Sequence, residues 1–304
     1  HGRFHGEGIL SWPDGRMYCG SWQRGRRHGQ GLAILESGLR YEGDWYRHRM
    51  HGQGHLRWPD GRSYLGQFEH GDPQGLGQMD LPDGRHFEGH FSAGVPQGQG
   101  ILRLADGRIF QGHWLEGELI GEGSLKSIDG SIYKGFFLGH EPHGQGRLKT
   151  ADGSLYEGSF EHGKPQGHGC LRSPDGRVYR GLFHQGHAEG QGDLQLSDGR
   201  RYVGGFVAKH FHGHGSYYWP DGKSYHGQWE QDKRCGRGVY TLSDGSRYVG
   251  FFEADQPHGL GMLYDAKGQV KQAGRWVNNR LVEPIKLQTK DYPFEARNDG
   301  ADAV

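Results

Sequence analysis

The sequence predicts an all-β fold, an elongated open antiparallel sheet solenoid of successive β-hairpins with no closed barrel. Three observations support this prediction. One pattern recurs every 23 residues along most of the 304-residue chain, apolar and polar side chains alternate inside each copy, and an Asp-Gly turn closes most copies. A strict repeat of this kind is typical of proteins whose units bury their apolar faces only by stacking on their neighbours.

The repeat is clearest at two aromatic positions that are separated by a glycine. The first position is filled, with no insertion or deletion, by Tyr18, Tyr41, Tyr64, Phe87, Phe110, Tyr133, Tyr156, Tyr179, Tyr202, Tyr225 and Tyr248. The second, four residues later, is filled by Trp22, Trp45, Phe68, Phe91, Trp114, Phe137, Phe160, Phe183, Phe206, Trp229 and Phe252. Two further glycines follow in each copy. Eleven full copies in register exclude a chance pattern.

The copy at 41–63 shows why each unit reads as a hairpin. Tyr41 and Trp45 share one face of a strand by period-2 alternation. Residues 46–51 are expected to form a polar connection, after which Leu56 and Trp58 share a face of the second strand. The run 59–61, Pro-Asp-Gly, then predicts a turn, because it supplies a fixed φ, a local acceptor and a glycine that tolerates positive φ.

The repeats define the domain organisation. We expect a repeat array over residues 1–276, with a partial repeat at 1–17, eleven repeats at 18–270 and a degenerate end at 271–276. Because the chain begins inside a repeat, we expect a longer natural protein. Residues 277–304 are expected to form a C-terminal cap and a disordered tail. Lys209, Asp232 and Asp255 replace a turn glycine of the earlier copies, so these turns are expected to differ in shape.

Composition and spacing argue against several functions. Lys plus Arg and Asp plus Glu are equal at 36 each, which gives no global case for nucleic-acid binding. Equivalent histidines of adjacent hairpins would lie roughly 9.5 Å apart, too far to share one metal ion. His210, His212 and His214 form the densest local cluster, and we expect it to be solvated. No Gly-x-Ser-x-Gly elbow occurs. We therefore expect no catalytic residues, no metal and no cofactor.

Two sets of basic residues require separate interpretations. Those after the turns, Arg16, Arg62, Arg85, Arg108, Arg177, Arg200 and Lys223, each stand two residues from an Asp and predict a self-neutralising ladder. A second set projects from the strand face opposite the apolar column and is a candidate anion or lipid face. It comprises Arg57, Arg103, Lys126, Arg147, Lys149 and Arg172.

The aromatic face is the strongest candidate binding surface. A single sheet without covering helices must bury its apolar side in its own curvature or accept a partner. We therefore predict a groove for a helical or extended segment of a partner protein. Its predicted lining is Tyr41, Trp45, Tyr64, Phe68, Phe87, Phe91, Phe110, Trp114, Tyr133, Phe137, Tyr156, Phe160, Tyr179, Tyr202, Tyr225 and Trp229.

The succession Tyr-x-Gly-x-Trp/Phe, Gly, His-Gly-x-Gly and Asp-Gly resembles the MORN (membrane occupation and recognition nexus) repeat over residues 1 to about 276. The resemblance implies elongated sheets of hairpins that are non-catalytic, bind partner proteins along a groove, often self-associate and are linked to membranes or phosphoinositides. The family's histidine is present here at His28, His51 and His143 but is replaced by Gln74, Ile120 and Cys235, among others. A function that needs a complete histidine column is therefore not expected.

These observations together favour a non-catalytic scaffold that binds a partner segment along an aromatic-lined groove and forms a homodimer. One alternative is a peripheral module for anionic phospholipid headgroups. Another is the regulatory repeat arm of an enzyme whose catalytic domain lies outside this chain. We expect a cytoplasmic location, with the cytoplasmic membrane surface or the cytoskeleton as the sites of attachment, and no nucleic-acid partner.

Overall fold

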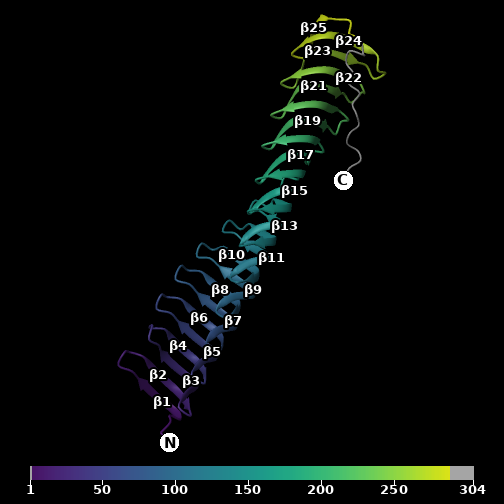
Figure 1. The fold of residues 1–304 in the computed structure, drawn as a ribbon. Coiled ribbons are helices and arrows are strands. Elements are labelled where there is room, and N and C mark those ends of the chain that lie inside the picture. Colours follow the sequence, from purple (N-terminus) through teal and green to yellow (C-terminus); the bar gives the residue numbers. More distant parts are fainter. Residues whose placement is uncertain (1, 288–304) are drawn as a thin grey trace. The chain divides into compact units, whose positions relative to one another are not determined.

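The computed structural model describes residues 2–287, and in that range the chain consists of strands and the turns between them (Figure 1). The chain divides into two compact units, His1–Ala151 and Asp152–Val304. No helix long and apolar enough to cross a bilayer is found within residues 2–287.

The first unit holds thirteen strands. They are β1 (Gly6–Ser11), β2 (Met17–Gln23), β3 (Arg26–Ile34), β4 (Arg40–Tyr46), β5 (Arg49–Arg57), β6 (Ser63–Glu69), β7 (Asp72–Asp80), β8 (His86–Ser92), β9 (Val95–Arg103), β10 (Ile109–Leu115), β11 (Glu118–Lys126), β12 (Ile132–Leu138) and β13 (Glu141–Lys149).

The described part of the second unit holds twelve strands. They are β14 (Leu155–Glu161), β15 (Lys164–Arg172), β16 (Val178–His184), β17 (His187–Gln195), β18 (Arg201–Val207), β19 (His210–Tyr218), β20 (Ser224–Glu230), β21 (Lys233–Thr241), β22 (Arg247–Glu253), β23 (Gln256–Tyr264), β24 (Val270–Val277) and β25 (Arg280–Pro284).

Within each unit, every strand pairs antiparallel with the strands that precede and follow it in the sequence. Among the described strands, the first and last of a unit do not pair with each other, so neither unit closes into a barrel. The predicted all-β, open hairpin solenoid is therefore confirmed.

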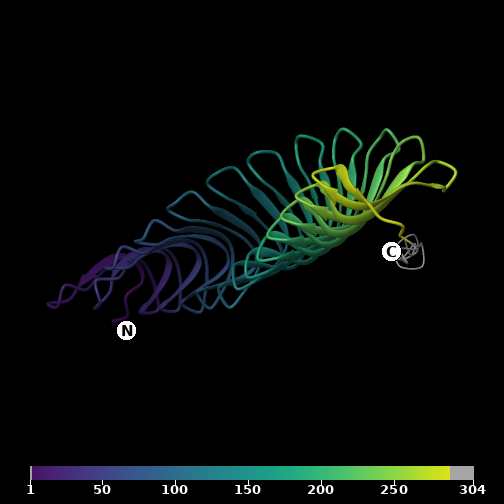
Figure 2. The same cartoon turned by 90° about the horizontal axis from the view of Figure 1, so that it is seen from above.

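Each hairpin is bent by an irregularity beside its first glycine. In β4 and β5, Gly43 faces Gly54, but the next pair is Trp45 with Met50, so one residue of β4 opposes three of β5. Such a bulge turns the strand sharply, and Figure 2 shows the hairpins of each unit as bent ribbons. Gly52 makes the bend possible because its φ of +59° lies in the left-handed region, which favours glycine.

The bend places each tyrosine ring directly over a glycine of the next strand. A Cβ atom on Gly54 would lie only 2.3 Å from the Tyr41 hydroxyl oxygen. That hydroxyl donates to the Asp44 carbonyl oxygen at 2.8 Å, a carbonyl that lies in the bend. The Asp44 side chain in turn accepts the Gln53 N–H at 2.9 Å. Polar groups exposed by the bulge are thus satisfied locally, as buried polar groups require.

The rings form the core of each unit by repeated edge-to-face contacts. Tyr41 meets Trp45 of its own hairpin at 5.1 Å and Phe68 of the next hairpin at 5.0 Å between ring centroids, with interplanar angles of 90° and 82°. Edge-to-face pairs at these distances are favourable beyond the area they bury. Tryptophans add a second link between hairpins, since Trp45 Nε1 donates to the Gly31 carbonyl oxygen at 2.9 Å.

The hairpin at 110–132 departs from this packing. Leu119 is fully buried there, and the His140 ring packs on Trp114 at 5.1 Å and on Phe110 at 5.8 Å. The strands β10 and β11 nevertheless keep the same register shift as their neighbours. The backbone pattern therefore tolerates a local change in how the core is filled.

The prediction of a polar connection at residues 46–51 is wrong. Residue 46 ends β4 and residue 49 begins β5, so only Arg47 and His48 connect the strands. Their φ values of +49° and +75° are those of a type I′ turn, whose twist suits a two-residue hairpin. Lys209, Asp232 and Asp255 adopt φ values of +75°, +66° and +71° in their own turns. The expectation that these turns differ in shape is therefore also wrong, because side-chain-bearing residues accept the same strained conformation.

Replacing Lys209 with glycine is expected to stabilise the protein. The left-handed conformation costs a side-chain-bearing residue roughly 1–2 kcal/mol, and glycine gives back part of this through the entropy of the unfolded chain. The expected net gain is about 0.5–1 kcal/mol in the free energy of unfolding, measured by urea denaturation. Gly186, at the equivalent place with a φ of +85°, provides the reciprocal control. Gly186→Lys should destabilise by a similar amount, and equal stability of both variants and the wild type would contradict the strain argument.

The turns between hairpins confirm the predicted self-neutralising ladder. In the turn at 58–62, the Asp60 carboxylate accepts the Arg62 backbone N–H at 3.0 Å and pairs with Arg62 Nε at 2.8 Å. These contacts hold the pKa of Asp60 below its usual range, the backbone hydrogen bond being the largest cause. The same ion pair forms at Arg16, Arg85, Arg108, Arg177, Arg200 and Lys223.

The C-terminal end departs from the repeat. Trp276 of β24 takes the place of a second aromatic, since its ring contacts Tyr248 at 5.3 Å and its Nε1 donates to the Gly261 carbonyl oxygen at 3.1 Å. After β25, Leu287 packs on a cluster of Val239, Val249, Met262 and Tyr264. The expected cap thus falls partly within the described residues, whereas the tail predicted at 288–304 lies outside them.

Candidate binding groove

Two rows of side chains rise beside the aromatic column of the first unit. The turn wall consists of the residues opposite the second aromatics across each hairpin: Arg27, Met50, Pro73, Pro96, Leu119 and Pro142. The opposite wall consists of the residues just before each turn between hairpins: Trp12, Leu35, Trp58, Leu81, Leu104, Ser127 and Thr150, all of which are half-buried. In the second unit the equivalent positions are held by Ala188, Phe211 and Arg234, and by Leu196, Trp219 and Leu242.

The groove between the walls is best defined beside the first hairpins. There a cavity of about 360 Å³ is lined by residues of both walls, including Trp12, Leu35 and Arg27, with Trp22 at its base. Cavities of this size lie at the small end of the range for ligand sites. The space suits one or two side chains of an extended segment.

The sixteen rings predicted to line a partner groove form the core beneath it. Each is at most 5% exposed, because the bent hairpins close around them. They therefore supply a floor, and a partner would touch mainly the two walls. Their contribution to binding stays a prediction.

Sequence reasoning missed the turn wall, because residues 46–51 and their equivalents were interpreted as polar connections. A signal was present, since Pro73, Pro96, Pro142, Pro165 and Pro257 recur at multiples of 23 residues. A proline that recurs at one position of a hairpin indicates a defined place beside the turn rather than a variable loop.

Burial raises the pKa of the tyrosines that form the floor. It raises the pKa of Tyr64, Tyr133, Tyr156 and Tyr179 to about 12. These phenols therefore stay protonated even in alkaline solution that ionises an exposed tyrosine. They act as hydrogen-bond donors to backbone carbonyl groups, as Tyr64 does to Gln67 at 3.0 Å.

The predicted anion face is divided between the units. Arg57, Arg103, Lys126, Arg147 and Lys149 are exposed on the first unit, on the sheet face opposite the rings. Arg172 belongs to the second unit and pairs with Glu157 at 2.9 Å. Within the second unit, Arg172 therefore has a local acidic partner.

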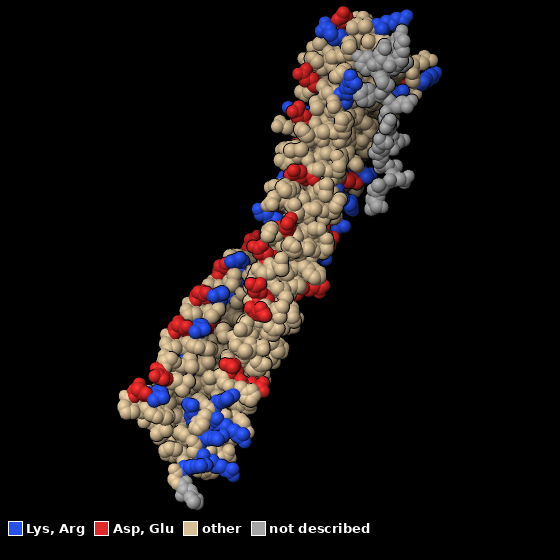
Figure 3. Space-filling view, in the orientation of Figure 1, with Lys and Arg blue, Asp and Glu red and all other residues tan. Residues whose placement is uncertain are grey.

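A different basic cluster lies beside the hairpin turns of β2–β3 and β4–β5. It comprises Arg24, Arg26, Arg27, Arg47 and Arg49, and the segments 23–30 and 46–51 contain no acidic residue. Figure 3 shows basic side chains gathered over this end of the first unit. Sequence reasoning missed this cluster, although the local excess of arginine was visible.

The predicted histidine cluster is solvated. His210, His212 and His214 are exposed, and His210 pairs with Asp232 at 2.5 Å. No group of three or more His, Cys, Asp or Glu side chains suited to a metal ion is found within residues 2–287.

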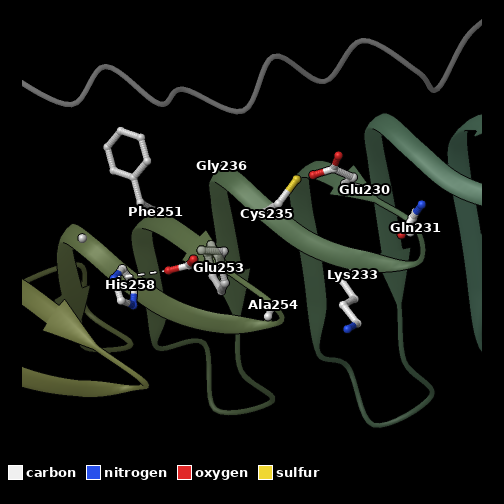
Figure 4. Close-up of a pocket in the computed structure, with 11 residues that line it drawn as sticks. Glu230, Gln231, Lys233, Cys235, Gly236, Phe251, Glu253, Ala254 and His258 are labelled. Carbon is white, nitrogen blue, oxygen red and sulfur yellow. Dashed lines mark ion pairs between the residues drawn. The ribbon is translucent and has the colours of Figure 1, made fainter.

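A further hollow of about 540 Å³ lies in the second unit beside β20–β23 (Figure 4). Its lining includes Glu253 and His258, which pair at 3.3 Å, together with Cys235 and Lys233. These polar groups come from adjacent hairpins. A smaller hollow of about 240 Å³ lies at the equivalent place between two hairpins of the first unit, where Gln53, Gln67 and Gln74 line it.

Comparison with solved structures gives matches of low overall similarity. The wild-type TCP10 domain of Danio rerio CPAP is 15% identical, with 88% of this chain and 100% of that chain covered and a TM-score of 0.21. The TCP10c domain of Drosophila melanogaster Sas-4 is 10% identical, with 59% and 93% covered and a TM-score of 0.28. The SAS-4 (dCPAP) TCP domain of Drosophila melanogaster, in complex with a proline-rich motif of Ana2 (dSTIL), is 9% identical, with 65% and 88% covered and a TM-score of 0.26.

No curated protein matches the chain. The model of the MORN repeat family, in contrast, matches residues 1–15, 18–40, 41–61, 64–84, 87–107, 133–155, 156–176, 179–200, 202–224, 225–247 and 248–270. The matches leave out 108–132, the region of the hairpin with the altered core, although β10 and β11 form there as elsewhere. Because the matched stretches cover most of the sequence, the chain belongs to the MORN repeat family.

Proposed function

We propose that this protein is a non-catalytic scaffold that binds a segment of a partner protein along the groove between the two walls. The observation that supports this function is the pair of largely apolar rows over the aromatic floor. The opposite wall is half-buried throughout, and the turn wall is half-buried apart from the buried Pro73 and Leu119. Apolar side chains that a fold leaves partly exposed in a continuous row are typical of protein–protein contact surfaces. A helical or extended segment would bury them by inserting its own side chains between the walls.

The groove proposal is tested by paired variants in capture from an extract of cells that make the protein. Trp58→Glu and Leu81→Glu place charges on the half-buried wall. Because a buried, unpaired carboxylate opposes binding, this double variant is expected to lose about 90% or more of a stoichiometric partner retained at high salt. Leu65→Glu with Leu76→Glu is the matched control, since these leucines are 53% and 56% exposed on the opposite face.

Mass spectrometry of the captured proteins measures the result. Equal retention by the wild type and the groove variant, with both variants folded by circular dichroism, would contradict the groove as the binding surface.

A second candidate function, binding to anionic lipid headgroups, is favoured by one feature of the outer face. Across β9–β13, Arg103, Ile109, Lys126, Ile132 and Lys149 form a continuous cross-strand row. Cations alternating with isoleucines suit a headgroup layer, where charges meet phosphates and apolar side chains reach the acyl boundary.

Lipid binding is tested with phosphatidylserine vesicles in a flotation assay. Changing Arg103, Lys126 and Lys149 to glutamate is expected to weaken binding at least tenfold, because each cation near an anionic surface contributes about 1 kcal/mol. Binding by the wild type should also fall at high salt. Vesicle binding that neither salt nor the triple variant reduces would exclude this row as the lipid contact.

A further inference from the structure

Arg27 of the first unit and Arg234 of the second occupy the same position of their hairpins. Each lies opposite a second aromatic, Trp22 for Arg27 and Trp229 for Arg234. Each guanidinium also covers two aromatic rings at equivalent positions. Arg27 lies 5.7 Å above the Tyr18 ring and 4.3 Å above the Trp45 ring. Arg234 lies 5.6 Å above the Tyr225 ring and 5.7 Å above the Phe252 ring. The two sites therefore share one geometry on the turn wall.

The residue that completes each site differs. At Arg234 it is Asp255, whose carboxylate accepts the Arg234 backbone N–H at 3.0 Å and Nε–H at 3.1 Å. A buried guanidinium is stabilised by such a carboxylate. The Arg234 side chain, 18% exposed, is thus neutralised within the chain.

At Arg27 the equivalent residue is His48, which offers no negative charge. Its Nδ1 accepts the Arg27 backbone N–H at 3.3 Å, and its carbonyl oxygen accepts from the Arg27 guanidinium at 3.3 Å. Burial, together with Arg27 and Arg26, lowers the pKa of His48, so its imidazole is neutral near pH 7. Within residues 2–287, no carboxylate forms an ion pair with Arg27.

The cavity around Arg27 combines apolar side chains with a guanidinium that has no carboxylate partner among the described residues. Arg27, His48, Trp12, Trp22 and Leu35 line the cavity of about 360 Å³. The other charged group in its lining, Arg16, is already paired with Asp14 at 2.8 Å. Burial is the largest cause that lowers the pKa of the Arg27 guanidinium, while Tyr18 opposes the shift.

We propose that this cavity receives an acidic side chain carried within an apolar segment of a partner protein, and that Arg27 binds its carboxylate. The incoming carboxylate would take the role that Asp255 has at Arg234, and the flanking apolar residues would lie on Trp12 and Leu35. This assignment rests on the proposed groove function and specifies the chemistry of the partner. Arg24, Arg26, Arg47 and Arg49, beside the cavity, would favour the approach of such a segment.

The test uses a displayed library of random 12-residue peptides selected on the full-length chain, followed by affinity measurement of a selected synthetic peptide. The wild type is expected to enrich peptides with an Asp or Glu between apolar residues. Arg27→Met removes the guanidinium, and His48→Asp supplies an internal carboxylate at the place that Asp255 has beside Arg234. Both variants are expected to lose the preference for acidic peptides. Their affinity for the selected peptide should fall about tenfold, the effect of one charge-assisted contact.

Two further measurements serve as controls. Lys134→Met removes an exposed charge from β12, on the sheet face opposite the rings, and should bind within about twofold of the wild type. Thermal unfolding shows whether each variant is folded, and His48→Asp should be at least as stable as the wild type because it neutralises Arg27.

The outcomes separate the two proposals. Selected apolar peptides without an acidic residue, or an acidic preference unchanged in Arg27→Met and His48→Asp, would overturn the role of Arg27 while leaving the groove proposal in place. A library that yields no peptide sensitive to the groove variant Trp58→Glu, Leu81→Glu would contradict both.

Discussion

Gly54→Ala is expected to destabilise the protein by about 3 kcal/mol, the upper range for overpacking a rigid core. The new methyl group would lie 2.3–2.5 Å from atoms of the Tyr41 ring. That ring is fully buried and held edge-on by Trp45 and Phe68, so it has no space to move aside. The free energy of unfolding from urea denaturation measures the effect.

The partial repeat at the start of the chain provides a matched control for this change. Gly8 occupies the place equivalent to Gly54, and among the described residues a Cβ atom on it would meet Trp22 alone, at an ordinary 3.5 Å. Gly8→Ala should therefore change stability by less than about 0.5 kcal/mol, the usual range for a surface substitution. Equal effects of Gly8→Ala and Gly54→Ala would show that the glycine requirement is not caused by the tyrosine ring.

Trp114→Ala is expected to cost about 4 kcal/mol, because it removes a large side chain from a close-packed core. Trp114 is 1% exposed, contacts Phe87 at 5.0 Å and His140 at 5.1 Å, and donates from Nε1 to the Gly100 carbonyl oxygen at 3.0 Å. The substitution would open a cavity between two hairpins and leave that carbonyl group without its donor. Urea denaturation again measures the change.

Trp114→Phe is the control for the second prediction. Phenylalanine fills the same position in the neighbouring hairpins as Phe91 and Phe137. The variant should therefore retain most of the packing and lose about 1 kcal/mol with the indole hydrogen bond. An alanine variant as stable as the phenylalanine variant would mean that the ring column does not hold the hairpins together.

Much of the fold could be predicted because the same residue pattern recurs in eleven copies. Alternation around Tyr41 and Trp45 indicates the first strand, and the Asp60-Gly61 turn with Arg62 indicates both the reversal and its ion pair. These features depend on contacts between residues that are close in sequence, where local chemistry decides the conformation.

The groove could be predicted only in part. Period-2 alternation places the rings on one face, but it does not indicate that three residues of β5 oppose one of β4. That bulge at Gly52 bends the hairpin, buries the rings as a floor and brings the turn wall into position. The difference between Arg27 and Arg234 was hidden for a related reason, since His48 and Asp255 belong to the following hairpin and meet the arginines only through strand pairing.

Site-specific photo-crosslinking tests the central claim, that partner segments bind between the two walls, most directly. A benzophenone amino acid is placed at Leu81 on the groove wall, or at the exposed Leu65 on the opposite face, and the protein is irradiated in an extract of cells that make it. Binding between the walls predicts a discrete crosslinked partner from position 81 and none of that mass from position 65. Crosslinks to the same partner from position 65 alone would show that binding occurs on the outer face and would contradict the groove as the binding site.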